Sequence, residues 1–149
     1  GCSVALACDM RVMSSEAYLM QAFIGIGLVP DSGAHWFLPR LAGMARAFEY
    51  AATGRKIPAD EAMQVGLVNK VAKPAELERV TMEIANSFAN ASTKAIGMMK
   101  RIFNKALTSD LDSLLEYEAY MQQSASETED HKEGIKAFIE KRKPEFKGK

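Results

Sequence analysis

The sequence has few cysteines and histidines and no excess charge of either sign. Its 149 residues include two cysteines, Cys2 and Cys8, and two histidines, His35 and His131. These are too few and too scattered for a metal site or a disulfide framework, so we expect no bound metal and two small buried thiols. Nineteen basic residues balance nineteen acidic ones. Zero net charge excludes a field that would hold nucleic acid or an anionic membrane over most of the surface.

The sequence also lacks a long hydrophobic run. Its longest apolar stretch, residues 23–29, is far shorter than the roughly 20 residues of a membrane-spanning helix, and no basic segment followed by an apolar one opens the chain. We therefore expect a soluble protein of the cytoplasm. Hydrophobic residues make up 48% and charged residues 26%, which excludes disordered and fibrous classes.

Several common catalytic signatures are missing. The sequence has no GxSxG elbow, no GxxxxGK[ST] loop and no GxGxxG segment after a strand. Serine-dependent hydrolysis, nucleotide hydrolysis and dinucleotide binding therefore lack their usual motifs.

The apolar spacing predicts mixed structure in the first half of the chain and helices in the second. Lys73-Pro74 is the one plausible internal boundary, so we expect regions 1–73 and 74–149. In the first region we expect short helices, short extended segments and a loop before Asp31. The expected helices are 1–8, 31–39, 44–52, 58–65, 75–89, 92–107, 111–126 and 131–142, and the expected extended segments are 10–13, 17–20 and 67–72.

Asp31 is the residue that could carry chemistry. It follows the apolar stretch 23–29, where desolvation would raise its pKa and make it a usable proton carrier. After Pro30, however, Asp31 or Ser32 also suits the N-cap of a helix, and backbone hydrogen bonds would then lower the Asp31 pKa. The residues alone leave both interpretations open. We expect that helix to end at Pro39.

Four segments together resemble the second half of the crotonase superfamily, the enoyl-CoA hydratase/isomerase family. They are GCSVALACD, IGLVPDSG, LPRLAGMARAFEYAATGRKIPADEAMQVGLVNKV and GIKAFIEKRKPEFKGK, in that order and spacing. The resemblance implies an α/β fold, with the C-terminal part of a spiral of ββα turns over 1–73 and a helical oligomerisation region over 74–149. It also implies acyl-CoA thioester substrates, homotrimers or hexamers, and no cofactor beyond the coenzyme A of the substrate. Members are usually nearly twice as long, so we expect the front half of the spiral to be absent here.

The resemblance also implies a catalytic arrangement. In the family, two backbone N–H groups hold the thioester carbonyl as an enolate forms, and one of them lies at a helix start that falls at or just before Gly1. The two glutamates of the hydratases fall at Ser3 and Phe23, which do not titrate near neutral pH, so simple hydration is disfavoured. A single carboxylate can move a double bond by taking a proton from one carbon and returning it to another. Asp31 is the predicted carboxylate.

The segment QAFIGIGLVPDSG is most similar to the ring-opening isomerases of phenylacetyl-CoA breakdown, which shift double bonds and convert a ring epoxide to an oxepin. By this resemblance Phe23, Ile24 and Trp36 are apolar walls of the acyl site, with Ser3 beside them, although Trp36 suits an ordinary core equally well. Relatives contact the adenine and phosphate of coenzyme A through residues that correspond to Phe146 and Lys147. A solvated basic tail is the competing interpretation of that segment.

Three alternatives stay open at this point. The protein could be an enoyl-CoA hydratase. It could run another thioester reaction of the family, such as aryl-CoA dehalogenation by direct attack of the Asp31 carboxylate on the ring. It could also be a non-catalytic oligomerisation fragment.

Overall fold

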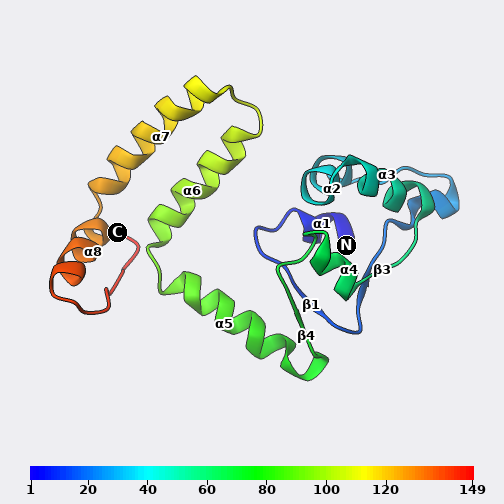
Figure 1. Cartoon of the computed structure of the whole chain (residues 1–149), viewed down its shortest axis with the longest axis horizontal. Coiled ribbons are helices and arrows are strands. Elements are labelled where there is room, and N and C mark those ends of the chain that lie inside the picture. Colours follow the sequence, from blue (N-terminus) through cyan, green and yellow to red (C-terminus); the bar gives the residue numbers. More distant parts are fainter. The chain divides into compact units, whose positions relative to one another are not determined.

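The computed structural model describes all residues, 1–149, and they form two compact units, Gly1–Met82 and Glu83–Lys149 (Figure 1). The division falls inside helix α5 (Leu77–Ala89), which follows a single 3-10 turn, η2 (Pro74–Glu76). The region boundary expected near residue 73 stays a prediction.

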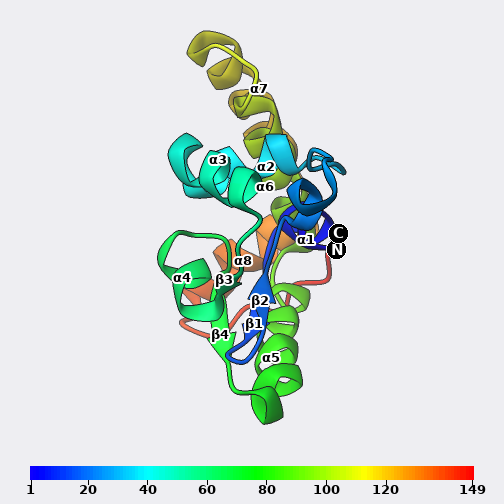
Figure 2. The same cartoon turned by 90° about the vertical axis from the view of Figure 1, so that its right-hand side faces the viewer.

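Short helices and two small sheets make up the first unit. Strands β1 and β4 pair in parallel, with Met13 opposite Val71, and both views show them side by side (Figure 2). Strands β2 and β3 pair antiparallel, with Leu19 opposite Ile57. The elements are α1 (Cys2–Leu6), β1 (Val12–Ser14), β2 (Tyr18–Leu19), η1 (Ala22–Ile26), α2 (Ala34–Ala42), α3 (Met44–Thr53), β3 (Ile57–Pro58), α4 (Ala59–Gln64) and β4 (Lys70–Ala72).

The hydrophobic core of this unit consists of one or two buried side chains from each of most elements. Three fully buried side chains, Tyr50, Ile57 and Leu67, come from α3, β3 and the turn after α4. They pack in one cluster with Leu6 of α1 and Leu38 of α2. Because no single element is long, stability in this unit depends on contacts between elements.

Two local predictions are wrong. Helix α2 does not end at Pro39 but continues to Ala42, and Gly43, with φ of 81°, ends it. Leu38 and Ala42 are both buried, so packing of the helix holds the turn around Pro39. Cys8 is exposed, because α1 ends at Leu6 and leaves it in the turn that follows, and Cys2 at the start of α1 is only half-buried.

The second unit consists of the end of α5 and three further helices, α6 (Thr93–Ala106), α7 (Leu111–Ser126) and α8 (Glu129–Ile139). Helices α6 and α7 pack as a hairpin (Figure 1). Asp110 caps α7 by accepting from the Ser113 backbone N–H at 2.9 Å, and Thr128 caps α8 through the His131 N–H at 3.1 Å. The longest helix, α7, has 16 residues, and no helix is both long and apolar enough to cross a membrane.

Candidate functional site

The loop that carries Asp31 begins with the 3-10 turn η1, which packs against α3. Gly27, with φ of 73°, ends η1, and the Leu28 N–H donates back to the Phe23 carbonyl at 3.0 Å. The loop can approach α3 because Gly54, the residue that ends α3, has no side chain. A Cβ there would lie 3.0 Å from Ile24 Cγ2 and 3.2 Å from the Gln21 carbonyl.

Asp31 lies on this loop, two residues before Gly33, the N-cap of α2. Its Oδ1 accepts a hydrogen bond from the Ser32 hydroxyl at 2.9 Å. Neither Asp31 nor Ser32 caps the helix, so that interpretation is wrong. The reason is the backbone: Ser32 and Gly33 both have positive φ, 52° and 84°, which turns the chain before the helix begins. The Asp31 carboxylate is therefore not occupied by capping.

The apolar side chains before Asp31 are exposed, and so is Asp31 itself. Ile24 is 47% exposed, Leu28 56% and Val29 74%. The desolvation that the sequence led us to expect is therefore not produced by this chain's own packing. The loop instead presents an exposed acid shortly after several exposed apolar side chains in the sequence.

The predicted oxyanion residue lies on a neighbouring element. Gly1 is the exposed N-cap of α1, and its carbonyl accepts from the Ala5 N–H at 2.9 Å. Ser3 is buried, at 3% exposure, in the first turn of α1. Because α1 packs against α2, the helix after Asp31 and the helix after Gly1 are neighbours in the fold. Phe23 is half-buried within η1.

Trp36 does not belong to the core. It is 41% exposed, and the Arg40 guanidinium lies over its ring at 3.4 Å from the centroid. Arg40 also donates to the Trp36 carbonyl at 3.0 Å. The indole is therefore held in place from within α2, which is what a wall of a binding site requires.

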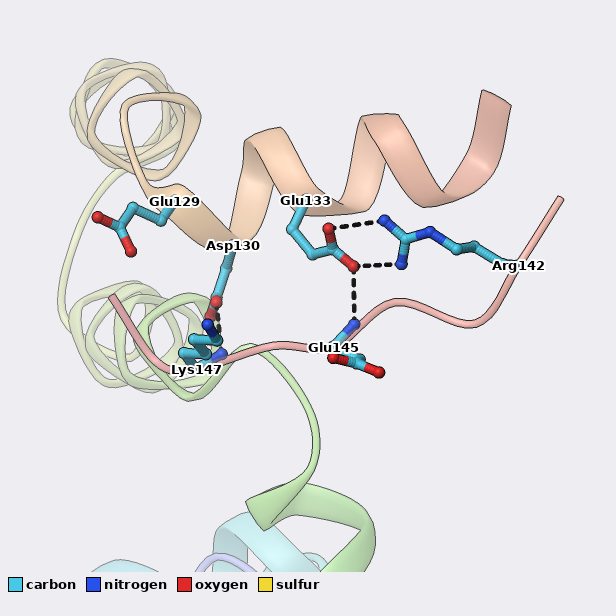
Figure 3. Close-up of a pocket in the computed structure, with 6 residues that line it drawn as sticks. All are labelled: Glu129, Asp130, Glu133, Arg142, Glu145 and Lys147. Carbon is cyan, nitrogen blue, oxygen red and sulfur yellow. Dashed lines mark hydrogen bonds and ion pairs between the residues drawn. The ribbon is translucent and has the colours of Figure 1, made fainter. Parts of the chain in front are cut away.

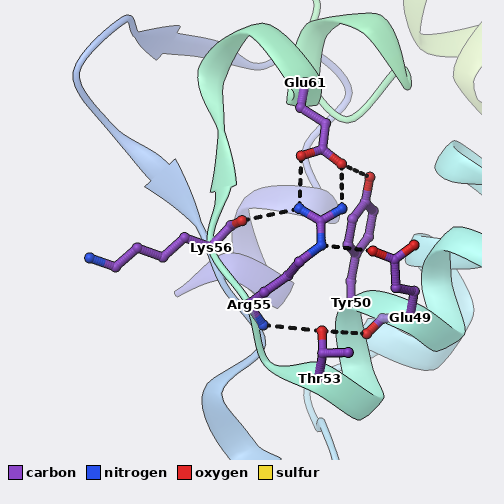
Figure 4. Close-up of polar contacts among 6 residues, drawn as sticks. All are labelled: Glu49, Tyr50, Thr53, Arg55, Lys56 and Glu61. Atoms are coloured by element: carbon purple, nitrogen blue, oxygen red, sulfur yellow. Dashed lines mark hydrogen bonds and ion pairs between the residues drawn. The ribbon is translucent and has the colours of Figure 1, made fainter.

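A polar cluster that the sequence did not reveal supports the Gly54 turn (Figure 4). Arg55 donates to both carboxylate oxygens of Glu61, at 2.8 and 2.6 Å, and to Glu49 at 2.7 Å. The Tyr50 hydroxyl donates to Glu61 at 2.8 Å. Hydrogen bonds from Arg55, followed by that from Tyr50, lower the pKa of Glu61 from 4.5 to about 2. The cluster joins α3 to α4 and has a structural role.

This cluster predicts a specific dependence of stability on pH. Because the folded pKa of Glu61 lies below its ordinary value, its contribution is complete above pH 4.5 and is lost as the pH falls towards about 2. We expect Glu61→Gln to lower the melting temperature at neutral pH, and the gap between parent and variant to shrink through that acid window. Thermal unfolding followed by circular dichroism at a series of pH values measures this gap. A gap independent of pH would contradict the assignment.

The two remaining predicted site residues, Phe146 and Lys147, lie in the second unit. The Lys147 side chain is exposed and Phe146 is half-buried. Phe146 lines an apolar groove of about 410 Å³ with Ile135 and Phe138, whereas Lys147 lines a polar groove of about 370 Å³. Hydrogen bonds to Asp130 hold the backbone here, while the Lys147 side chain stays exposed to solvent, so both interpretations of this segment stay open.

Metal-ligating side chains do not gather anywhere in the chain. No group of three or more His, Cys, Asp or Glu residues is arranged to hold a metal ion.

Comparison with known proteins identifies relatives along the whole chain. The profile of the family described as enoyl-CoA hydratase/isomerase matches residues 1–149. The chain is 40% identical to the short-chain-enoyl-CoA hydratase of Clostridium acetobutylicum, over 97% of this chain and 56% of that protein. It is 36% identical to the 1,2-epoxyphenylacetyl-CoA isomerase of Escherichia coli K12, over 100% of this chain and 57% of that protein. The chain thus spans about half the length of the curated relatives it matches.

Solved structures give the same result. The enoyl-CoA hydratase from Bacillus anthracis matches with a TM-score of 0.95 and 36% identity, over 100% of this chain and 58% of that one. The enoyl-CoA hydratase/isomerase from Cupriavidus metallidurans CH34 matches with a TM-score of 0.93 and 35% identity, over 99% of this chain and 56% of that one. These matches support a crotonase-like α/β fold, although this chain is mostly helical with small sheets. That it forms the C-terminal part of the spiral, with a region for oligomerisation, stays a prediction.

Proposed function

Because the chain belongs to the enoyl-CoA hydratase/isomerase family, we propose that the protein moves a double bond, or opens a ring epoxide, in an acyl-CoA thioester, with Asp31 as the proton shuttle. One observation carries this proposal: the Asp31 carboxylate is not used in capping and is exposed on the same loop as the exposed apolar side chains Leu28 and Val29. An acyl group bound there would cover those side chains and desolvate the acid. The 36% identity to an epoxyphenylacetyl-CoA isomerase supports the same class of substrate.

The chemistry requires one acid and one oxyanion site. In a 3-enoyl thioester, the Asp31 carboxylate takes a proton from C2, and the electrons move onto the thioester oxygen to give a dienolate. A backbone N–H at or just before Gly1, at the start of α1, stabilises that charge. Protonated Asp31 then returns the proton to C4, which leaves the double bond between C2 and C3. No second titrating group is needed, in keeping with Ser3 and Phe23 at the other two positions.

The acyl group would lie against Phe23, Ile24 and Trp36. All three are at least partly exposed, and Arg40 fixes the Trp36 ring. Flat apolar walls of this kind suit an aromatic or unsaturated acyl chain. Ser3, buried in the first turn of α1, would line the end of the same site.

A panel of enoyl-CoA thioesters assayed in heavy water tests the reaction class. We expect 3-enoyl substrates to be converted to 2-enoyl products, with deuterium at C4 to the extent that the exposed Asp31 carboxyl exchanges its proton with solvent before returning it. A hydratase is the second candidate, because relatives such as the Clostridium acetobutylicum protein carry that name. Accumulation of 3-hydroxyacyl thioester from 2-enoyl substrates would favour it, and no turnover with any thioester would favour a non-catalytic subunit.

We assign contacts with the adenine and phosphate of coenzyme A to Phe146 and Lys147. The apolar groove beside Phe146 and the exposed Lys147 ammonium support this assignment. We expect Lys147→Ala to weaken coenzyme A binding by roughly fivefold, and by more at low salt, because screening weakens a contact between exposed charges. Isothermal titration calorimetry at two salt concentrations measures it. Equal affinity for parent and variant would instead favour a tail without a ligand.

We further propose that the helical region assembles the protein into a homotrimer or hexamer in the cytoplasm. Large apolar side chains that α6 and α7 leave exposed support the assembly. They include Phe103, Leu111, Leu115 and Tyr120.

A further inference from the structure

The last seven residues fold back along α8, and carboxylates of that helix hold their backbone (Figure 3). Asp130, in the first turn of α8, is 2% exposed. Its Oδ1 accepts from the Lys147 N–H at 2.7 Å, and its Oδ2 accepts from the Gly148 N–H at 3.1 Å. Its own backbone N–H donates to the Lys149 carbonyl at 3.2 Å. A buried charge is stable only with such partners, and most of these belong to the tail.

Glu133, one turn further along α8, holds the segment where the tail begins. Arg142 donates to both of its carboxylate oxygens, at 2.6 and 2.9 Å, and the Glu145 backbone N–H donates at 2.9 Å. The hydrogen bonds from Arg142 and Glu145 lower the pKa of Glu133 to about 2, so it is charged at neutral pH. The two carboxylates therefore fix the tail through the side chain of Arg142 and through the backbone at residues 145, 147 and 148.

The tail also packs closely against two helices. The Phe146 ring lies over Gly134 of α8, where an added Cβ would be in ordinary contact with the ring at 3.6 Å. Gly148 has φ of 69°, and a Cβ there would lie 2.5 Å from Thr93 Oγ1 of α6. The tail conformation is therefore set by carboxylates on one helix and by steric contact with another.

We propose that Asp130 and Glu133 are positioning residues for coenzyme A. They hold the tail so that Phe146 meets the adenine and Lys147 the phosphate groups. This inference rests on the proposed function, because it assumes that the tail contacts coenzyme A. In this role each carboxylate acts through the tail that it holds, by its hydrogen bonds to that segment.

The sign of the expected effect separates positioning from simple electrostatics. Both carboxylates lie near the site proposed for a polyanion. If charge alone mattered, removing either would strengthen binding of coenzyme A, because a repulsive charge disappears. If they position the tail, removing either weakens binding, because Lys147 and Phe146 lose their fixed places.

The test compares Asp130→Asn and Glu133→Gln with Glu129→Gln in the whole protein. Glu129 is a matched control, since it is exposed, lies in the same turn as Asp130 and makes no hydrogen bond to the tail. By calorimetry with free coenzyme A, we expect each of the first two variants to bind about tenfold more weakly, as loss of a charge-assisted hydrogen bond predicts. The control should bind as well as the parent or slightly more tightly.

A second readout excludes a general loss of structure. Kinetics are compared on a coenzyme A thioester and on the pantetheine thioester of the same acyl group, which lacks the adenosine and its phosphates. We expect Asp130→Asn to raise KM for the first substrate at unchanged kcat, and to leave the second unchanged. Should that variant not fold, Gly148→Ala disturbs the tail without changing charge and should also weaken coenzyme A binding.

The outcomes are distinguishable. Parental affinity, or tighter binding, in both Asp130→Asn and Glu133→Gln would overturn this inference and leave the proposed function standing. A parent protein that binds no coenzyme A would overturn the proposed function, and this inference with it. Equal losses on both thioesters would show that the carboxylates only maintain the fold.

Discussion

Asp31→Asn is expected to lower kcat for isomerisation of a 3-enoyl-CoA thioester by at least about a hundredfold, the usual contribution of a general acid–base group. Asparagine matches aspartate in shape and can still accept the hydrogen bond from the Ser32 hydroxyl. It cannot take a proton from carbon. Because the exposed loop conformation does not depend on capping by Asp31, the variant should fold normally. Binding of coenzyme A should therefore remain at the parental level.

The measurement is the rate of double-bond migration, together with solvent deuterium exchange into recovered substrate. Asp60→Asn is the matched control: Asp60 is an exposed acid in the first turn of α4, outside the proposed site, and its replacement should leave the rate unchanged. Parental activity in Asp31→Asn would refute the shuttle. If the parent is instead given a halogenated aryl-CoA thioester, and intact-mass analysis finds an aryl ester on Asp31 together with released halide, the carboxylate is a nucleophile and the dehalogenation mechanism holds.

Local signals in the sequence predicted several elements closely. Helix α7 has the predicted bounds, Leu111–Ser126, because its apolar spacing is regular and Asp110 caps it. Helix α3 ends one residue from its predicted position, since Gly54 takes a left-handed conformation there. Strand β3, of only two residues, was not predicted, because it exists only through its pairing with β2. The prediction that α2 ends at Pro39 failed for a similar reason, since packing of Leu38 and Ala42 maintains the helix around the proline.

The functional features likewise separate into those set by local sequence and those formed only by tertiary contacts. The family could be identified from the sequence because its motifs are local and occur in a fixed order, and the profile match confirms it. The polar clusters around Glu61 and Asp130 could not be identified from the sequence. Arg55 and Glu61 meet only after α3 and α4 fold onto each other, and Asp130 meets Lys147 only after the tail reverses along α8. Exposure of Asp31 was also beyond prediction, because hydrophobic neighbours in sequence do not have to cover one another in space.

Ile57→Ala is expected to destabilise the first unit strongly. Ile57 is fully buried, pairs with Leu19 across the β2–β3 sheet and belongs to the cluster that joins the short elements of the first unit. Truncation removes apolar contacts and leaves a cavity, and such changes lower the free energy of unfolding by about 2–5 kcal/mol. Ile57→Val, which removes one methyl group, should cost about 0.5–1.5 kcal/mol.

Urea unfolding followed by circular dichroism measures these losses as shifts in midpoint at constant slope. Met44→Ala is the control, because Met44 is 72% exposed at the start of α3 and should change stability by less than about 0.5 kcal/mol. A loss at Ile57→Ala no larger than that at Met44→Ala would mean that the β2–β3 pair does not contribute to the core. In that case the Arg55–Glu61 cluster and the contact of Gly54 with η1 would hold this part of the unit, and Glu61→Gln would become the more damaging change.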